Sequence, residues 1–338
     1  MAPLRIGLSG GGTDVSPFKD NFGGEVINVT ISLYINCTIE INNSNRINFI
    51  SLDKNITNSY KLCKSINIRK SLELHVEVYN EINRLFNINP KNGFNLYTSS
   101  SIPPGSGLGS SSTLVVAMIE AYRRWYNLKI TNYDIARIAY KIERINLNFK
   151  GGMQDQYAAA FGGLNHIKFY KNGKVKVNKI NVNKNILNEL ETNIFLLYTN
   201  KSRDSGNIIK EQIKNVQNLD SKAISSTKSL KDDVKLIRKF ILKGDMKNFG
   251  KIIGKSWDSK KKIANCISNL FIDNIFKKIN SKKIYGAKVS GAGGGGFISI
   301  VADPTIEFQI KNILSDMNVH FVDFKFDPEG VRSWIPNK

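Results

Sequence analysis

The chain has 338 residues, of which 41% are hydrophobic and 23% are charged, a balance typical of a folded protein with a large core and not of a disordered chain. The length favours two domains. An excess of 49 lysines and arginines over 28 acidic residues gives a formal charge of +21, but the basic residues are scattered and form no dense tail. We therefore expect anionic small molecules as partners, and neither nucleic acid nor a membrane.

Cysteine and histidine usage excludes two further classes of protein. Three distant cysteines allow neither a disulfide framework nor a CxxC metal pair, so we expect reduced, mostly buried thiols. The three histidines have no zinc-binding spacing. Because the sequence has no signal-peptide pattern and no apolar run of about 18 residues, we expect a cytoplasmic protein.

Predicted strands and helices alternate along the first half of the chain. Apolar residues in near alternation predict strands, and apolar residues three and four positions apart predict helices. The expected strands are 4–8, 25–41 and 94–100, and the expected helices are 71–86, one starting at 110, 132–145 and 154–161.

The second half reads as a separate unit. A lysine- and asparagine-rich stretch, 171–191, is expected to form a hairpin and the domain junction, which gives domains of 1–190 and 191–338. Beyond it we expect a buried strand at 194–198 and a helix-rich stretch that runs to residue 280. Strands are then expected at 287–289, 297–301 and 319–326, with a helix between the last two.

The sharpest motif is the glycine- and serine-rich loop IPPGSGLGSSS at residues 102–112, between a predicted strand and a predicted helix. Its backbone N–H groups and the positive end of the helix dipole would converge on one point, which predicts phosphate binding. The loop has no lysine of the GxxxxGK[ST] type and no acidic residue about 20 positions on, so the two best-known nucleotide loops are excluded. The residues expected to contact the nucleotide are Pro104, Gly105, Ser106, Gly107, Leu108, Gly109, Ser110, Ser111 and Ser112.

This loop resembles the second motif of the GHMP kinase superfamily. Residues 2–14 resemble the first motif of that family and residues 288–297 resemble the third, in the family's order. The resemblance implies an α+β fold of two domains, the first like ribosomal S5 domain 2 and the second ferredoxin-like. It also implies an ATP- and Mg²⁺-dependent kinase, with Gly293 and Gly294 of the third motif at the nucleotide.

The first motif narrows the resemblance. Gly11 and Gly12 stand where galactokinases carry a Glu-His pair, which disfavours galactose. The GGGTD segment and residues 152–163 are most similar to bacterial D-glycero-D-manno-heptose 7-phosphate kinases, which implies phosphorylation of an anomeric hydroxyl to a 1,7-bisphosphate used for nucleotide-activated heptose and surface polysaccharide. A fucokinase-like sugar 1-kinase, a mevalonate-type kinase and a non-catalytic regulatory or nucleic-acid-binding protein of this fold remain alternatives. A homo-oligomer remains open too.

The resemblance assigns the catalytic roles. It makes Asp155 the general base and Arg5 the cation that neutralises charge between donor and acceptor. Glu143 and Ser111 would hold Mg²⁺ through one carboxylate and one hydroxyl. The plain alternatives are a helix-capping aspartate and a glutamate paired with a basic neighbour.

Acceptor binding is expected from the first motif and from basic residues of the second half. A carboxylate at Asp14 could accept hydrogen bonds from sugar hydroxyls, and the plain alternative is an N-cap or Asx-turn after the glycines. A substrate that already carries a phosphate also needs a cationic pocket, whereas lysines at a helix surface are usually solvated. The expected acceptor-binding residues are Gly12, Thr13, Asp14, Gly152, Arg203, Lys260 and Lys261.

Overall fold

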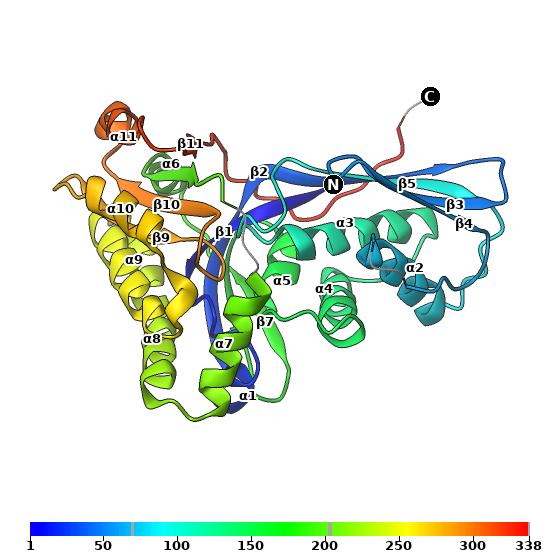
Figure 1. Cartoon of the computed structure of the whole chain (residues 1–338), viewed down its shortest axis with the longest axis horizontal. Helices are drawn as coiled ribbons and strands as arrows, with labels where there is room; N and C mark the ends of the chain where they lie inside the picture. The colour runs from blue at the N-terminus through cyan, green and yellow to red at the C-terminus, as the bar shows by residue number, and fades with distance from the viewer. Residues whose placement is uncertain (69–70, 202–204, 337–338) are drawn as a thin grey trace.

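The computed structural model describes residues 1–68, 71–201 and 205–336, which form two sheets with their helices (Figure 1). The first sheet has seven strands in the order β4-β3-β5-β2-β6-β7, with β1 paired to β2. Its strands are β1 (Ala2–Ser9), β2 (Gly24–Ile41), β3 (Arg46–Ser51), β4 (Ile56–Lys61), β5 (Phe94–Ser100), β6 (Leu164–Phe169) and β7 (Val175–Lys179). All neighbours are antiparallel except β3 and β5.

A layer of helices covers one face of this sheet (Figure 1). The helices are α2 (Glu73–Leu85), α3 (Ser110–Trp125), α4 (Asn132–Tyr140) and α5 (Gln154–Phe161), while the short α1 (Phe18–Phe22) follows β1. Their apolar stripes bury an aromatic cluster against the sheet, in which the rings of Phe94 and Tyr122 meet edge to face at 6.1 Å. A π-helical turn, η1 (Lys141–Asn146), continues α4, and such turns frequently mark functional sites.

The second sheet is antiparallel, with the order β11-β8-β10-β9. Its strands are β8 (Ile194–Tyr198), β9 (Ile284–Val289), β10 (Phe297–Ala302) and β11 (His320–Phe321). The accompanying helices are α6 (Lys184–Thr192), α7 (Ser205–Gln217), α8 (Ser221–Lys243), α9 (Met246–Lys261), α10 (Leu270–Lys278) and α11 (Glu307–Ile313), with 3-10 turns η2 (Asn265–Ile267) and η3 (Pro304–Ile306). Helix α9 lies close against β9 because Gly250 and Gly286 face each other: a Cβ on Gly286 would lie 1.9 Å from the Gly250 carbonyl oxygen.

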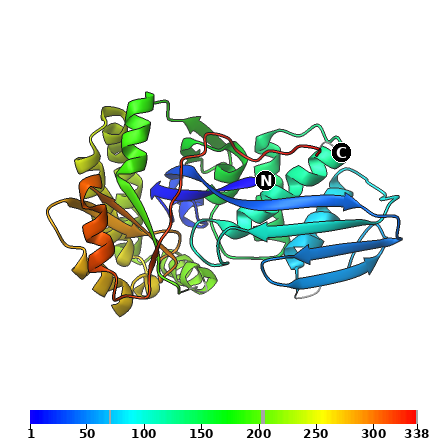
Figure 2. The same ribbon diagram turned by 90° about the horizontal axis from the view of Figure 1, so that it is seen from above.

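After β11 the chain returns to the first sheet (Figure 2). Residues 325–327 lie beside β2, where the Asp327 N–H donates to the Thr30 carbonyl at 2.9 Å. Further on, the Val331 N–H donates to the Ala159 carbonyl of α5 at 2.8 Å. The last segment of the chain is therefore part of the first sheet's packing.

The α+β architecture with two sheet-and-helix units is as predicted from the family resemblance, while the domain boundary at residue 190 stays a prediction. Three details of secondary structure differ from expectation. The β3–β4 hairpin was not predicted, 171–191 contains α6 as well as a hairpin strand, and the final strand is only two residues long. Cys63 and Cys266 are exposed, so the expectation of mostly buried thiols was wrong.

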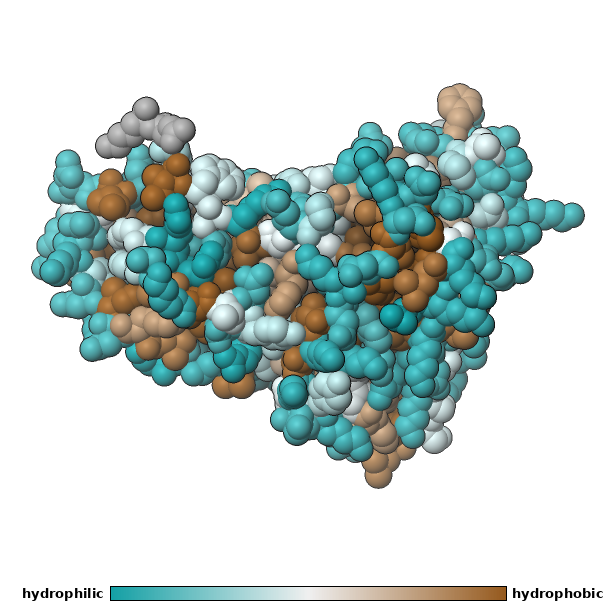
Figure 3. Space-filling view, turned by 180° about the vertical axis from the view of Figure 1, so that it is seen from behind, coloured by the Kyte–Doolittle hydropathy of each residue, from teal (hydrophilic) through white to brown (hydrophobic). Residues whose placement is uncertain are grey.

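Hydrophilic side chains cover most of the face drawn in Figure 3, and hydrophobic ones appear there in separate groups. In the part of the chain that the structure describes, no helix combines the length and apolarity needed to cross a membrane.

Candidate active site

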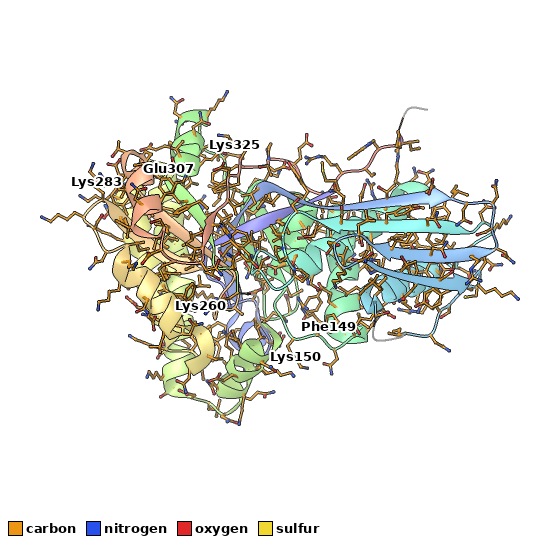
Figure 4. The ribbon with its side chains drawn as sticks, turned by 45° about the horizontal axis from the view of Figure 1, so that its top comes forward. Phe149, Lys150, Lys260, Lys283, Glu307 and Lys325 are labelled. Atoms are coloured by element: carbon orange, nitrogen blue, oxygen red, sulfur yellow. The ribbon has the colours of Figure 1, made fainter. Side chains whose placement is uncertain are left out.

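A cleft of about 430 Å³ lies between the first sheet's helices and the second unit. Residues from separate motifs of the sequence line it together: Arg5, Gly12, Asp14, Ser111, Glu143, Gly152, Asp155 and Lys260. Figure 4 labels Lys260 on α9 between the two units, with Phe149 and Lys150, which also line the cleft, on the side of the first sheet's helices.

The loop before α3 forms one wall of the cleft. Gly105, Gly107 and Gly109 have positive φ angles of 73°, 90° and 83°, a region that residues with a Cβ rarely adopt. Gly109 is also the residue before the first turn of α3, and a Cβ there would lie 3.1 Å from the Asp155 Cγ. The backbone can therefore approach a phosphate closely at the positive end of the α3 dipole.

Not every residue predicted for this loop faces the cleft. Gly105, Gly107, Gly109 and Ser110 to Ser112 line it, whereas Pro104 is exposed elsewhere and Ser106 and Leu108 are buried beneath the loop. The buried pair supports the loop through the backbone: the Leu108 carbonyl accepts from the Arg5 N–H at 3.2 Å, and the Ser106 carbonyl accepts from the Phe297 N–H at 2.9 Å.

The third glycine-rich loop meets the cleft at a different point from the one predicted. Gly291 and Ala292 line the cleft. Gly293 and Gly294 instead pack on η2, where the Gly294 N–H donates to the Ile267 carbonyl at 2.6 Å. A Cβ on Gly293 would lie 2.6 Å from the same carbonyl oxygen, so these two glycines are required for loop packing.

An arginine–aspartate pair occupies the middle of the cleft. The Arg5 Nε donates to Asp155 Oδ1 at 2.7 Å and Nη2 lies 2.6 Å from the same oxygen, while Nη1 donates to the Gly107 carbonyl at 2.7 Å. Arg5 is a residue of β1 with a buried side chain, whereas Asp155 lies at the start of α5 with a side chain that is 21% exposed. One carboxylate oxygen is thus fixed by the arginine and the other faces Gly109 and the phosphate loop.

A second buried cation lies behind this pair. Lys288 on β9 donates from Nζ to the Gly7 carbonyl of β1 at 2.9 Å, and so links the two units. Burial, reinforced by the positive charge of Arg5, lowers the pKa of Lys288 to about 8. This lysine belongs to the third motif, although the family resemblance assigned it no role.

Glu143 and Ser111, the pair that the resemblance assigns to Mg²⁺, meet at the cleft wall. The Ser111 hydroxyl donates to Glu143 Oε1 at 2.8 Å, and the buried Gln156 amide donates to Oε2 at 2.6 Å. No group of three or more His, Cys, Asp or Glu side chains that could hold a metal occurs among the described residues. Mg²⁺ is usually bound by one or two carboxylates with phosphate oxygens and water, so this pair of oxygen ligands fits Mg²⁺ together with a nucleotide.

Arg144 lines the same wall, where the sequence suggested only an ion-pair partner for Glu143. Its Nη1 lies 3.6 Å from Glu143 Oε1, and its other contacts, to Ser112 Oγ and the Gly152 carbonyl, are 3.4 and 3.3 Å long. These contacts are long for charge-assisted hydrogen bonds, so the guanidinium keeps the capacity to bind a phosphate at the cleft.

The first motif forms the other end of the cleft around Asp14. The carboxylate accepts from the Gly12 N–H at 3.2 Å and from the Gln154 N–H at 3.0 Å. Burial raises the pKa of Asp14 above its ordinary value, against the effect of these backbone hydrogen bonds. A Cβ on Gly152 would lie 1.9 Å from Asp14 Oδ2, so glycine is required there, while Thr13 turns inward to donate to the Glu25 carbonyl at 2.8 Å.

Of the basic residues predicted to bind the acceptor, Lys260 lines the cleft and Lys261 does not. Lys260 is buried, lines the cleft and donates from Nζ to the Gly291 carbonyl at 2.5 Å. Lys261 does not line the cleft and pairs with Asp258 at 3.0 Å on the outer face of α9. Arg203 lies outside the described residues.

Helix α7 adds a wall that was not predicted from the sequence. Ile209, Lys210 and Gln212 line the cleft opposite the first motif. A signal was available in the sequence: Ile208, Gln212 and Val216 recur every four residues, which places a glutamine in an otherwise apolar, buried stripe.

A loop at a helix start that can bind an anion, a pair of oxygen ligands that fits Mg²⁺ and a carboxylate held by an arginine are typical of enzymes that transfer phosphoryl groups. The chain belongs to the GHMP kinases: the family's N-terminal domain matches residues 73–163 and its C-terminal domain matches residues 237–320. As a kinase it takes ATP as the phosphoryl donor.

Relatives narrow the position of the chain within that family. A D-glycero-alpha-D-manno-heptose 7-phosphate kinase from Campylobacter jejuni is 40% identical over 334 residues, or 99% of this chain and 98% of the relative. The crystal structure of a D-glycero-D-manno-heptose 1-phosphate kinase from Bacteroides thetaiotaomicron matches with a TM-score of 0.85 at 36% identity, covering 100% of this chain and 98% of its own. A putative sugar kinase from Campylobacter jejuni matches with a TM-score of 0.81 at 38% identity, covering 98% and 96%.

Proposed function

We propose that this enzyme transfers the γ-phosphoryl group of ATP to the anomeric hydroxyl of D-glycero-D-manno-heptose 7-phosphate, giving the 1,7-bisphosphate. The observation that carries the proposal is the buried Lys260 at the acceptor end of a kinase cleft, beside the first-motif glycines. An ammonium group held there favours an acceptor that already bears a phosphate. The 40% identity to a heptose 7-phosphate kinase over nearly the full chain supports the same substrate.

In this proposal Asp155 acts on the acceptor hydroxyl. Oδ1 is held by Arg5, which leaves Oδ2 to take the proton as the new phosphorus–oxygen bond forms. ADP leaves with the electrons of the broken bond, and the proton passes from Asp155 to solvent. Arg5 neutralises charge that develops between donor and acceptor, and the loop before α3 holds the phosphates.

Ser111 and Glu143 would hold Mg²⁺ in the same proposal. When bound, the ion neutralises phosphate oxygens of the nucleotide. The contribution of the chain is to hold the Glu143 carboxylate in place at the cleft through the Ser111 hydroxyl and the Gln156 amide.

A panel of acceptors tests the proposal. The purified enzyme is assayed for ADP release with Mg²⁺·ATP and heptose 7-phosphate, heptose 1-phosphate, free heptose, fucose, galactose or mevalonate, and products are identified by ³¹P NMR. We expect heptose 7-phosphate to be preferred and the new phosphate to be on the anomeric oxygen. Preferred turnover of heptose 1-phosphate, fucose or mevalonate would overturn the substrate assignment, and absence of any turnover would favour a non-catalytic binding protein.

The phosphate contact is tested by Lys260→Met against Lys261→Met. A charge-assisted contact contributes roughly 1.5 to 3 kcal/mol, so we expect kcat/KM for heptose 7-phosphate to fall on the order of 10- to 150-fold in the first variant only. Free heptose should be used equally by both variants. An equal loss for phosphorylated and free heptose would remove Lys260 from phosphate recognition. A cytoplasmic location and a homo-oligomeric state stay predictions.

A further inference from the structure

The acceptor end of the cleft contains two buried side-chain amide atoms without a hydrogen-bond partner among the residues that the structure describes. Gln154 at the start of α5 leaves Oε1 unpaired, and Gln212 on α7 leaves Nε2 unpaired. Burying a polar group without a partner costs on the order of 1 to 3 kcal/mol, so such atoms in a binding cleft point to a ligand that satisfies them. One atom is an acceptor and the other a donor, which is the complement of a pair of hydroxyl groups.

The amide of Gln154 is oriented by Asp14. Its Nε2 faces Asp14 Oδ1 at 3.5 Å, and an ionised carboxylate only accepts hydrogen bonds, so Oε1 is the atom directed away from it. The carboxylate in turn is held by the Gly12 and Gln154 N–H groups. Asp14 is therefore engaged in fixing the first-motif turn and Gln154, and the free acceptor at this position is the glutamine.

Gln212 approaches the same turn from the other unit. Its side chain is 7% exposed, and Oε1 would lie 3.8 Å from a Cβ on Gly12. Gln154 Nε2 and Lys260 Nζ would lie 3.8 and 3.7 Å from a Cβ on Gly11. The unpaired Gln154 Oε1 itself would lie 3.7 Å from a Cβ on Gly7 of β1. The three polar side chains therefore lie beside Gly7, Gly11 and Gly12, which contribute no side chain, and the space beside these glycines is where an acceptor would contact them.

Resting on the proposed function, we infer that Gln154 and Gln212 determine sugar specificity, with Gln154 Oε1 accepting from one hydroxyl of the acceptor and Gln212 Nε2 donating to another oxygen. Lys260 binds the phosphate of the acceptor, whereas the two glutamine amides recognise the hydroxyl groups of its sugar ring. Because Gln212 comes from the second unit and Gln154 from the first, a bound sugar joins the two walls of the cleft.

The experiment uses the full chain with Gln154→Met, Gln212→Met and Gln217→Met, each of which replaces an amide with an apolar side chain of similar size. Gln217 is the control because it is an exposed glutamine on the same helix as Gln212. Heptose 7-phosphate and its monodeoxy analogues are compared as acceptors by kcat/KM, and acceptor binding without nucleotide is measured by calorimetry. Thermal unfolding verifies that every variant is folded.

We expect kcat/KM for heptose 7-phosphate to fall roughly 5- to 100-fold in each cleft variant, with KM for ATP unchanged. For the wild-type enzyme, kcat/KM should be lower for the deoxy analogue that lacks a hydroxyl bound by one of the glutamines than for heptose 7-phosphate. In the variant that lacks that glutamine, the two acceptors should have similar kcat/KM values. Wild-type discrimination that persists in both variants would overturn the inference while leaving the substrate assignment intact. A wild type that does not use heptose 7-phosphate would contradict the proposed function instead.

Discussion

At the residue scale, the contacts of Asp155 divide its two oxygens between an arginine and the cleft. Asp155→Asn keeps the size of the side chain and removes its capacity to take a proton. We expect kcat to fall roughly 10²- to 10⁴-fold, as general-base catalysis is worth that much, while nucleotide affinity stays close to wild type. Steady-state kinetics and calorimetry with a non-hydrolysable ATP analogue measure both quantities. Retention of near wild-type kcat would show that another group takes the proton.

Lys288 gives a pH-dependent prediction about stability. Its pKa of about 8 in the folded protein is below the ordinary 10.5, so between these two values the unfolded chain binds more protons. The contribution of Lys288 to the free energy of unfolding is therefore lowest below pH 8, and it rises as the pH increases towards 10.5. The shift corresponds to about 3 kcal/mol of unfavourable burial at neutral pH.

Lys288→Met removes that burial penalty together with the hydrogen bond to Gly7. We expect the variant to be more stable than wild type at pH 7, with the difference shrinking between pH 8 and 10.5. Urea unfolding of both proteins across this range measures it. A difference that does not change with pH would mean that Lys288 has an ordinary pKa in the folded protein.

At the element scale, α5 connects the proposed base to the proposed Mg²⁺ ligand. Gln156 follows Asp155 on this helix and donates to Glu143 at 2.6 Å and to Ser112 at 3.0 Å. Groups that orient a metal ligand typically contribute 10- to 100-fold in metal affinity. We therefore propose Gln156 as a positioning residue for the proposed Mg²⁺ site.

For Gln156→Met we expect a rise in the Mg²⁺ concentration needed for half-maximal activity on the order of 10-fold, with saturating Mg²⁺ restoring most of kcat. Mn²⁺ binding in the presence of nucleotide, followed by electron paramagnetic resonance, gives a readout independent of turnover. Unchanged Mn²⁺ affinity in the variant would limit Gln156 to a structural role.

Helical phase explains why some site residues could be predicted and others were not. Ile253, Trp257 and Lys260 are buried on one stripe of α9, and a rotation of about 100° per residue takes Lys261 off that stripe. The sequence therefore contains enough information to choose between the two lysines. Gln212 could have been found in the same way.

Other features depend on contacts between distant segments. Gly293 and Gly294 are needed where the third loop meets η2, a contact that no local pattern encodes. Arg144 reaches the cleft wall only because η1 and the Gly151–Gly152 turn lie side by side: a Cβ on Gly151 would lie 2.5 Å from the Arg144 guanidinium carbon. A contact between two motifs, such as that of Ser111 with Glu143, could be inferred from the sequence because the family resemblance carries the tertiary arrangement of these residues with it.

At the scale of the whole molecule, the segment after β11 stabilises the first sheet by packing against β2 and α5. Asp327 is buried there, where its carboxylate accepts from Arg332 at 3.0 Å and from the Glu329 N–H at 2.8 Å. Asp327→Ala removes the carboxylate that accepts from both the Arg332 guanidinium and the Glu329 N–H, so we expect a destabilisation of roughly 1 to 3 kcal/mol and a lower unfolding temperature. Asp323→Ala, at an exposed position of the same segment, is the control. Calorimetric scans compare the two, and equal unfolding temperatures would show that Asp327 does not fasten the segment.

The return of residues 325–331 to β2 and α5 also sets an order for biosynthesis. The helix that carries Asp155 is synthesised near the middle of the chain, but the segment that completes its packing leaves the ribosome after the whole second unit. At ordinary translation rates the first unit waits roughly 10 to 30 s for that segment. A nascent chain stalled before residue 322 therefore exposes the edge of β2 and the end of α5, which makes it a target for chaperones and for proteolysis.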